Sequence, residues 1–567
     1  MRALLLRSLA AAALLALLAG SASAAATITI INLDGAGEGF NDPTAAAPVG
    51  GNPGVTVGQQ RLNTFQRAAN IWGSILTSSV TIQIQAAFNP LTCTATSAVL
   101  GSAGPRFVEA NNAAFEFQGF WYHEALACKE AGVDLTPPGA DNGSDINAQF
   151  NSNLGAAGCL TGSGWYYGFD HNEGTQIDLL AVLLHEFGHG LGFSTTTSGT
   201  SGAYLNGPPQ LPAVWDRFLY DETTGLHWNQ NTPAQRVASA INTNNLTWDG
   251  GQVTFAAAHF LSGVPEVAVP FGGGFLDGNA ASFGAALTTG GVTAQAVVVN
   301  DPVAPSGDGC ETPFINAAQL VGRIAVIDRG VCTFTSKALN AQNAGAIGVI
   351  LVNNAAGAFA PGGSDPSVTI PVIGITQTDG AALKTAITGG PTTVTVRLSS
   401  TRISGLHASG RVRMYSPNPF QSGSSVSHYD VSLLPNALME PAINPDLTDN
   451  VDLTEALFRD IGWLPRTLAV PASYPSSTVE LATFPNPARG GTSVHFVLPA
   501  DERVELVLFD VSGRQVRQLA RGTYAAGAHD VAWDGRDADG RAAAPGVYLA
   551  RLKGGRTNAT QSLVLIQ

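Results

Sequence analysis

Two histidines four residues apart, with a glutamate directly after the first, are the residues of this chain best suited to chemistry. They are His185, Glu186 and His189, in the segment LLHEFGHGLGF at 183–193. Residues four apart on an α-helix project from one face, so both imidazoles can bind the same metal ion. Neutral imidazole suits Zn²⁺, and a zinc site with an open position lowers the pKa of its water to about 7. Glu186 is placed to take the proton of that water, so the motif predicts hydrolysis.

The residues before the motif predict the helix that must carry it. The apolar run Leu179, Leu180, Val182 and Leu183 would anchor that helix in a core. Thr175 precedes Asp178 by three residues, a spacing that predicts a capping box at the start of the helix. A capped and anchored helix favours a metal site over two unrelated surface histidines.

The third metal ligand does not follow from local spacing. In proteases with the pattern HExxHxxGxxH, the next histidine follows the glycine by three residues. Here Gly192 occupies the glycine position, but the next position holds Thr195, a poor zinc ligand. The best candidate lies far downstream in SSVSHYD at 424–430, which is followed by NALMEP at 436–441.

At these residues the chain resembles leishmanolysin-type metalloproteases, which are metzincins whose third histidine follows a long insertion and precedes a methionine turn. The resemblance implies that His428 is the third ligand and that Met439 packs beneath the metal. Tyr429 departs from the tryptophan of that family. The long gap between His189 and His428 is a larger departure, and it requires a folded insertion that returns the chain to the metal.

Two other residues compete with His428 for this role. Glu222 would suit a protease that uses two histidines and a glutamate, although it lies among turn residues. His227 is the second alternative. His171, His227 and His259 are each more typical of surface residues or of residues that support a ligand from behind.

Length and composition favour a secreted protein of several domains. The 567 residues suggest three or four domains. Arg2 and Arg7, an apolar run at 9–18 and a small-residue cleavage site at 22–24 predict a signal peptide over residues 1–24. We therefore expect a secreted or extracellular-surface protein with no transmembrane segment. The net charge of −14 disfavours nucleic acid as a partner.

Five cysteines in an exported protein predict two disulfides and one free thiol. Cys310 and Cys332 fall in one segment and should pair. Of the other three, Cys93 and Cys159 are the favoured pair, because Cys128 lies in a helix-like run and could be a buried small hydrophobe. The pairing of these three residues stays open.

The first part of the protease domain is expected at 25–262 and the second at 401–465. Strands are predicted at 27–31, 80–84 and 145–150, with helices at 59–76 and 452–463. Asp446, Asp449 and Asp452 could bind Ca²⁺, but they lack the glycine and final glutamate of an EF-hand, so roles as caps are favoured. An edge strand beside the zinc helix would let an extended peptide bind through main-chain hydrogen bonds.

Residues 263–400 and 481–567 indicate two further modules, the second after a linker at 466–480. The first alternates strands at 322–330, 346–354 and 370–375 with a helix at 334–342. It resembles a protease-associated (PA) domain, a non-catalytic module inserted in secreted peptidases, which implies a lid or a substrate-docking surface. Alternating strands in the second predict a β-sandwich similar to Ig-like modules of the flagellar hook-cap type and to type IX sorting domains. That module is a candidate for attachment to the cell surface.

The predicted fold is therefore an α+β metzincin-like zinc protease domain, with an inserted α/β PA domain and a C-terminal β-sandwich. The leading hypothesis is a secreted zinc metalloendopeptidase that acts on protein or peptide substrates, with Glu186 as the catalytic base. The alternative is a surface adhesion protein with a structural or degenerate zinc site. Glu186 disfavours this alternative, because a structural site has no use for a base.

Overall fold

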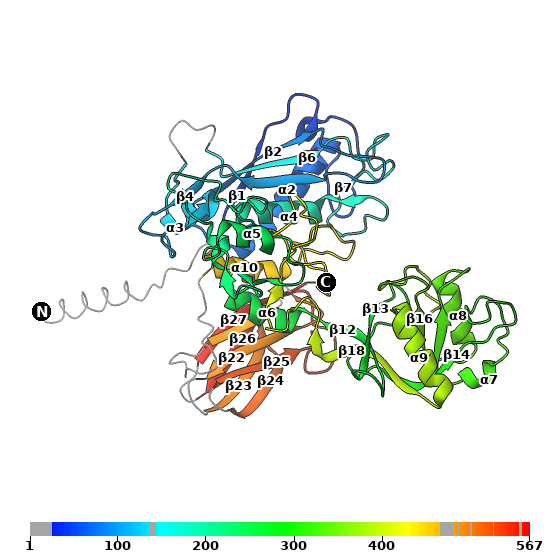
Figure 1. The fold of residues 1–567 in the computed structure, drawn as a ribbon. Helices are drawn as coiled ribbons and strands as arrows, with labels where there is room; N and C mark the ends of the chain where they lie inside the picture. The colour runs from blue at the N-terminus through cyan, green and yellow to red at the C-terminus, as the bar shows by residue number, and fades with distance from the viewer. Residues whose placement is uncertain are drawn as a thin grey trace, which may run out of the picture. The chain divides into compact units, whose positions relative to one another are not determined.

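The computed structural model describes residues 25–136, 143–464, 480–484, 488–498, 502–524, 527–554 and 558–566. The predicted signal peptide and almost all of the predicted linker lie outside these residues. The chain divides into two compact units, of which one, Leu261–Gly405, is inserted into the other (Figure 1). Among the described residues, no helix is both long and apolar enough to cross a membrane.

A four-stranded sheet of order β1-β2-β6-β3 organises the N-terminal part of the chain. The strands β1 (Ile28–Asn32), β2 (Ile82–Asn89) and β6 (Ile146–Asn151) are parallel, and each overlaps a predicted strand. The edge strand β3 (Gly101–Pro105) runs antiparallel to β6. Its sequence GSAGP has no β-branched or aromatic residue, so strand propensity gave no signal for it.

Helices α2 (Val57–Ile75) and α4 (Leu179–Leu191) pack with this sheet (Figure 1). The indole Nε1 of Trp72 in α2 donates to the carbonyl oxygen of Leu184 at 3.1 Å. Gly190 lies so close to Ile146 of β6 that a Cβ at this position would stand 2.5 Å from its Cγ2 atom. The helix that carries the HExxH motif is therefore fixed on both sides by close packing.

The start of α4 differs from the predicted capping box. Asp178 is itself the N-cap, and its carboxylate accepts hydrogen bonds from the amides of Leu180 and Ala181 at 2.8 and 3.4 Å. Aspartate directly before the first helical residue satisfies these free amides without help from Thr175. At the other end, Gly192 adopts a φ of 129°, and Trp463 donates to the Leu191 carbonyl at 2.6 Å.

A second sheet, of order β10-β9-β11-β19, joins the chain before the insertion to the chain after it. Its members are β9 (Leu219–Asp221), β10 (Leu226–His227), β11 (Leu246–Trp248) and β19 (Val412–Arg413). The pairing of Trp248 with Val412 returns the chain to the first unit. The closing helix is α10 (Asp452–Ile461), which is shorter at its C-terminal end than predicted. Further elements of this unit are α3 (Glu124–Ala131), α5 (Pro233–Ser239), α6 (Gly251–Phe260), β4 (Val108–Ala110), β5 (Trp121–His123), β7 (Trp165–Tyr166) and β8 (Ile177–Asp178).

The inserted unit is a closed barrel of order β12-β13-β17-β16-β15-β14-β18. The strands predicted from sequence are β15 (Ile324–Asp328), β16 (Gly348–Val352) and β17 (Val372–Ile375), which pair in parallel. The other strands are β12 (Gly263–Ala268), β13 (Phe275–Ala280), β14 (Val292–Val298) and β18 (Thr393–Ile403), and the helices are α7 (Ala317–Leu320), α8 (Phe334–Asn343) and α9 (Gln377–Gly389).

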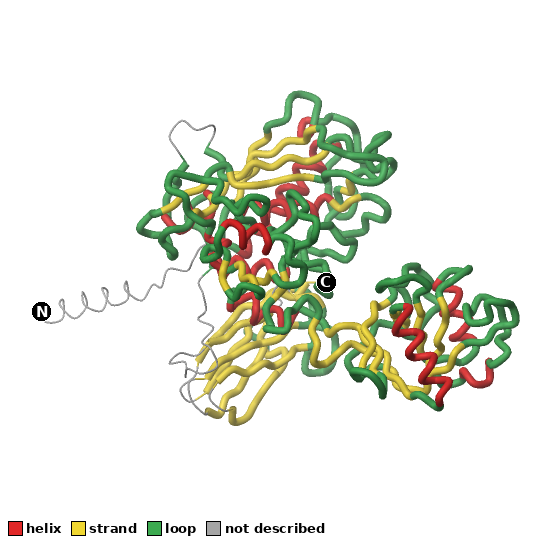
Figure 2. The backbone as a smooth tube through the Cα atoms, viewed as in Figure 1, coloured by secondary structure: helices red, strands yellow, loops and turns green. Residues whose placement is uncertain are grey.

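The described residues from 480 onward form strands and loops only (Figure 2). One sheet has the order β20-β22-β25 and the other β21-β27-β26-β23-β24. Side chains from both sheets, among them Phe496, Leu506 and Trp533, share one buried core, so this module is a β-sandwich. Its strands are β20 (Glu480–Phe484), β21 (Ala488–Arg489), β22 (Thr492–Leu498), β23 (Glu502–Asp510), β24 (Gln515–Tyr524), β25 (Gly527–Trp533), β26 (Gly546–Gly554) and β27 (Asn558–Ile566).

The disulfides join Cys93 to Cys159 and Cys310 to Cys332, the pairs favoured from the sequence. Cys128 is a buried free cysteine in α3. Burial raises the pKa of its thiol to about 12, so Cys128 behaves as a small apolar residue.

Candidate metal centre

Three imidazole rings from two distant parts of the chain meet at the C-terminal end of α4. His185 and His189 lie on α4, and His428 comes from the segment that follows β19. Each pair of Nε2 atoms in this triad is separated by 3.2 Å. Tetrahedral zinc with Zn–N bonds of about 2.0–2.1 Å places its nitrogen ligands roughly 3.3–3.4 Å apart. The donor atoms are therefore spaced as a shared zinc ion requires.

Hydrogen bonds behind the three rings decide which nitrogen faces the centre. The Nδ1 atoms of His185, His189 and His428 lie 2.7–2.8 Å from the carbonyl oxygens of Leu438, Phe193 and Ser424, respectively. A carbonyl oxygen can only accept, so each Nδ1 carries the proton and each Nε2 keeps its lone pair. Three lone pairs at this distance repel one another unless a cation lies between them.

Burial keeps these imidazoles neutral. It lowers the pKa of His185 to about 4 and that of His428 to about 3, and it lowers the pKa of His189 well below its usual value. The mutual repulsion of the protonated rings adds to this effect on His189 and His428. Neutral imidazole is the form that binds a metal ion, so the site needs no deprotonation near pH 7.

The Glu186 carboxylate lies against the edge strand β3. Its Oε2 accepts a hydrogen bond from the Ala103 amide at 3.0 Å. Burial raises the pKa of Glu186 to about 7, and the bond from Ala103 opposes that shift. A carboxylate with a pKa near the working pH is well suited to accept and return a proton.

A turn at Leu438 and Met439 packs against the helix α4. Met439 is fully buried, and its Sδ lies 2.8 Å from where a Cβ on Gly188 would stand. Only glycine leaves room there for the sulfur. Asp452 holds the turn by accepting from the Leu438 amide at 2.5 Å. The Leu438 carbonyl orients His185, so this turn and the ring of His185 are coupled.

The competing ligand candidates lie outside the triad. The Glu222 carboxylate accepts from Thr247 and Ser409 and pairs with Arg411. His227 pairs with Asp249 at 2.9 Å. The side chain of His259 lies outside the described residues.

His171 is not a surface residue, contrary to one of the two roles expected for it. It is a half-buried link between two carboxylates, with Nδ1 2.6 Å from Asp178 and Nε2 3.1 Å from Asp449. Arg67 also pairs with Asp449 at 2.6 Å. Since Asp178 caps α4, this network ties the start of the HExxH helix to the segment after Met439.

The suggested calcium ligands do not converge within the part of the chain that the structure describes. Asp446 accepts from the Asn436 amide group, Asp449 pairs with His171 and Arg67, and Asp452 caps the turn at Leu438. Of the three, Asp452 acts as a cap, a role favoured from the sequence, whereas Asp449 belongs to an ionic network with residues distant in the sequence.

The His171 network predicts a pH-dependent stability. Its two carboxylates raise the pKa of His171 from 6.5 to about 9. The network therefore adds about 3 kcal/mol to the free energy of unfolding. This contribution is complete below pH 6.5 and is lost as the pH rises through about 9. Urea unfolding of the wild type and of His171→Asn should show the gap between them shrinking from pH 6 to pH 10. Asparagine tolerates the φ of 54° at this position. A gap independent of pH would contradict the prediction.

Comparison with known proteins identifies the two accessory modules. Residues 292–383 match the PA domain family and residues 485–558 match the FlgD Ig-like domain family. The chain thus contains a PA domain, within the inserted unit, and a C-terminal Ig-like domain. Neither match includes the histidine triad.

Curated relatives match short parts of the chain. The minor extracellular protease Vpr of Bacillus subtilis is 36% identical over 95 residues, 17% of this chain and 12% of that protein. Leucine aminopeptidase 2 of Arthroderma otae is 42% identical over 81 residues, 14% of this chain and 16% of that protein. The chain thus spans less than a fifth of the length of either relative.

Among solved structures, a zinc aminopeptidase from Bacillus subtilis is 25% identical, with a TM-score of 0.19, over 27% of this chain and 37% of that one. FlgD from Xanthomonas campestris is 28% identical, with a TM-score of 0.12, over 16% of this chain and 62% of that one.

Proposed function

We propose that this chain is a secreted zinc peptidase whose ion is held by His185, His189 and His428. The convergence of three unprotonated Nε2 atoms at 3.2 Å carries the proposal. The curated relatives support a peptidase, because they include an extracellular protease and leucine aminopeptidases. When bound, the ion would acidify a water molecule and polarise the carbonyl group of a substrate.

Glu186 is the general base of the proposed reaction. It follows the first ligand directly, and its carboxylate has the environment of a group that titrates near neutrality. It would take a proton from the attacking water and pass it to the leaving amine. The amide of Ala103 holds the carboxylate in place and limits its rotation. A structural site would gain nothing from such a residue, so an adhesion function is not favoured.

The order of the ligands and the buried methionine turn favour a metzincin-like protease of the leishmanolysin type. Met439 packs against Gly188 between the two helical ligands, and Tyr429 occupies the position of the expected tryptophan. The Tyr429 hydroxyl donates to the Leu453 carbonyl at 3.1 Å, which anchors the segment that carries His428. A tyrosine at position 429 can therefore anchor this segment in place of a tryptophan.

The edge strand β3 favours cleavage within a peptide chain over removal of its first residue. Among the strands that the structure describes, β3 pairs with β6 alone, and the Ala103 amide donates to Glu186. An extended peptide can add beside such an edge and continue past the site in both directions. Protein and peptide substrates are therefore proposed, and endopeptidase action is favoured over the aminopeptidase activity named for several relatives.

A pair of fluorogenic peptides tests this assignment. One is an internally quenched peptide with an acetylated N-terminus, and the other is an aminoacyl coumarin amide. We expect hydrolysis of the blocked peptide, inhibited by 1,10-phenanthroline and restored by Zn²⁺. Hydrolysis of the aminoacyl amide alone would show an aminopeptidase, and no chelator-sensitive hydrolysis of either would reject the peptidase.

A further inference from the structure

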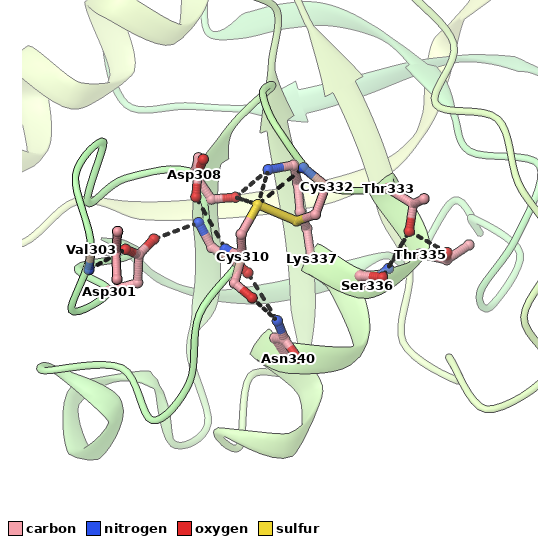
Figure 3. Close-up of a disulfide and its surroundings, with 11 residues drawn as sticks. Asp301, Val303, Asp308, Cys310, Cys332, Thr333, Thr335, Ser336, Lys337 and Asn340 are labelled. Carbon is pink, nitrogen blue, oxygen red and sulfur yellow. Dashed lines mark hydrogen bonds between the residues drawn. A yellow bond between two sulfur atoms is a disulfide. The ribbon is translucent and has the colours of Figure 1, made fainter.

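The disulfide of the inserted unit has two sulfur atoms in unequal surroundings (Figure 3). Cys310 Sγ accepts hydrogen bonds from the Lys337 ammonium group and from the backbone amide of Cys332, both at 3.2 Å. No comparable donor reaches Cys332 Sγ from the residues described. If the bridge opens, negative charge is therefore better stabilised on Cys310 than on Cys332.

Lys337 is a buried cation held against this sulfur. Its side chain lies on α8 and is fully buried, and its Nζ also donates to the Asp308 carbonyl. Burial lowers the pKa of Lys337, whereas four nearby carboxylates favour its charged form. They belong to Asp301, Asp308, Asp328 and Glu311. An ammonium group in contact with a sulfur stabilises the thiolate and makes that sulfur the better leaving group.

The other cysteine of the bridge, Cys332, lies beside a cavity. Cys332 lines a cavity of about 510 Å³, which also has Arg329, Thr333 and Phe334 on its wall. Cys310 is not among the lining residues. Val331, beside Cys332, is 85% exposed. A small solute can therefore approach the bridge from the Cys332 side, opposite the stabilised leaving group.

We propose that Cys310–Cys332 is a reactive disulfide that exchanges with low-molecular-weight thiols, which attack Cys332. The thiol loses its proton to solvent, and its sulfur forms a new bond to Cys332 Sγ. The Cys310–Cys332 bond breaks, and its electron pair stays on Cys310 as a thiolate beside Lys337. The products are a mixed disulfide on Cys332 and a free Cys310, so the exchange needs no other oxidant or reductant. The proposal is independent of the peptidase assignment.

The second disulfide of the chain is an internal control. Cys159 is 3% exposed, and the donor near its sulfur is the neutral amide of Asn151 at 3.7 Å. Cys93–Cys159 thus lacks the cation that would stabilise a departing thiolate. We expect it to exchange at least about tenfold more slowly than Cys310–Cys332.

Glutathione and the full chain supply the test. After timed exposure at pH 8, acid quenching, alkylation and peptide mapping by mass spectrometry should find glutathione on Cys332 and the alkyl group on Cys310. Lys337→Met should slow the exchange about tenfold, whereas Arg323→Met, which removes a cation of the same unit that is not part of this carboxylate network, should not change it. Glutathione mainly on Cys310, or equal rates for both disulfides, would overturn the proposal. Both readouts come from the wild type, so they decide the matter even if Lys337→Met fails to fold.

Discussion

Glu186→Gln is expected to retain zinc and to lose peptide hydrolysis by a factor of about 10²–10⁴, the usual contribution of a general base. Glutamine has the shape of glutamate, and its amide oxygen can still accept the hydrogen bond from Ala103. It cannot take a proton from water. The measurements are kcat/KM on the acetylated peptide and zinc content by mass spectrometry.

Glu222→Gln is the matched control for this variant. Glu222 lies outside the triad in a network with Arg411, so its neutralisation should leave kcat/KM unchanged. A Glu186→Gln protein that hydrolyses the peptide at the wild-type rate would remove Glu186 from the mechanism. Loss of zinc from the same variant would instead assign Glu186 a role in building the site.

His428→Ala is expected to weaken zinc binding by well over a hundredfold. Loss of a group that merely supports a ligand costs roughly 10- to 100-fold in metal affinity, and the loss of a ligand should cost more. The remaining pair, His185 and His189, would bind a metal with an incomplete set of donors. Titration with a zinc-competing fluorescent chelator measures this affinity directly.

His227→Ala provides the corresponding control, because His227 pairs with Asp249 and lies outside the triad. Its zinc affinity should equal that of the wild type. Unchanged affinity in His428→Ala would disprove the proposed ligand set. Far-UV circular dichroism of both variants separates a lost ligand from a lost fold.

The local parts of the site could be predicted from the sequence, because they depend on helical periodicity alone. A spacing of four residues puts His185 and His189 on one face of α4. The strands β1, β2 and β6 alternate or cluster apolar residues strongly enough to be seen. The PA and Ig-like modules were likewise visible as runs of strands at regular intervals, and the family matches confirm both.

The parts of the site that lie far from the HExxH motif in the sequence could be predicted only from a family resemblance, or could not be predicted. Apart from the family resemblance, nothing in the residues around His428 separates it from Glu222 or His227, because the choice depends on how β19 pairs with β11 across the insertion. The edge strand β3 was missed, since glycine, serine and proline carry little strand propensity. The cap at Asp178 was misplaced by three residues, and the position of His171 depends on a contact with the distant Asp449 that no local pattern reveals.

Main-chain carbonyls, rather than carboxylates, stand behind all three imidazoles. A carboxylate partner would donate electron density through the ring and offset part of the charge of the ion, as in the carboxylate–histidine–zinc arrangement. Neutral partners leave a dication more electrophilic toward an incoming acyl oxygen. Every amino acid has a main-chain carbonyl. Substitutions at positions 193, 424 and 438 can therefore change the side chain without removing the hydrogen bond that orients the ring, provided that the backbone keeps its path.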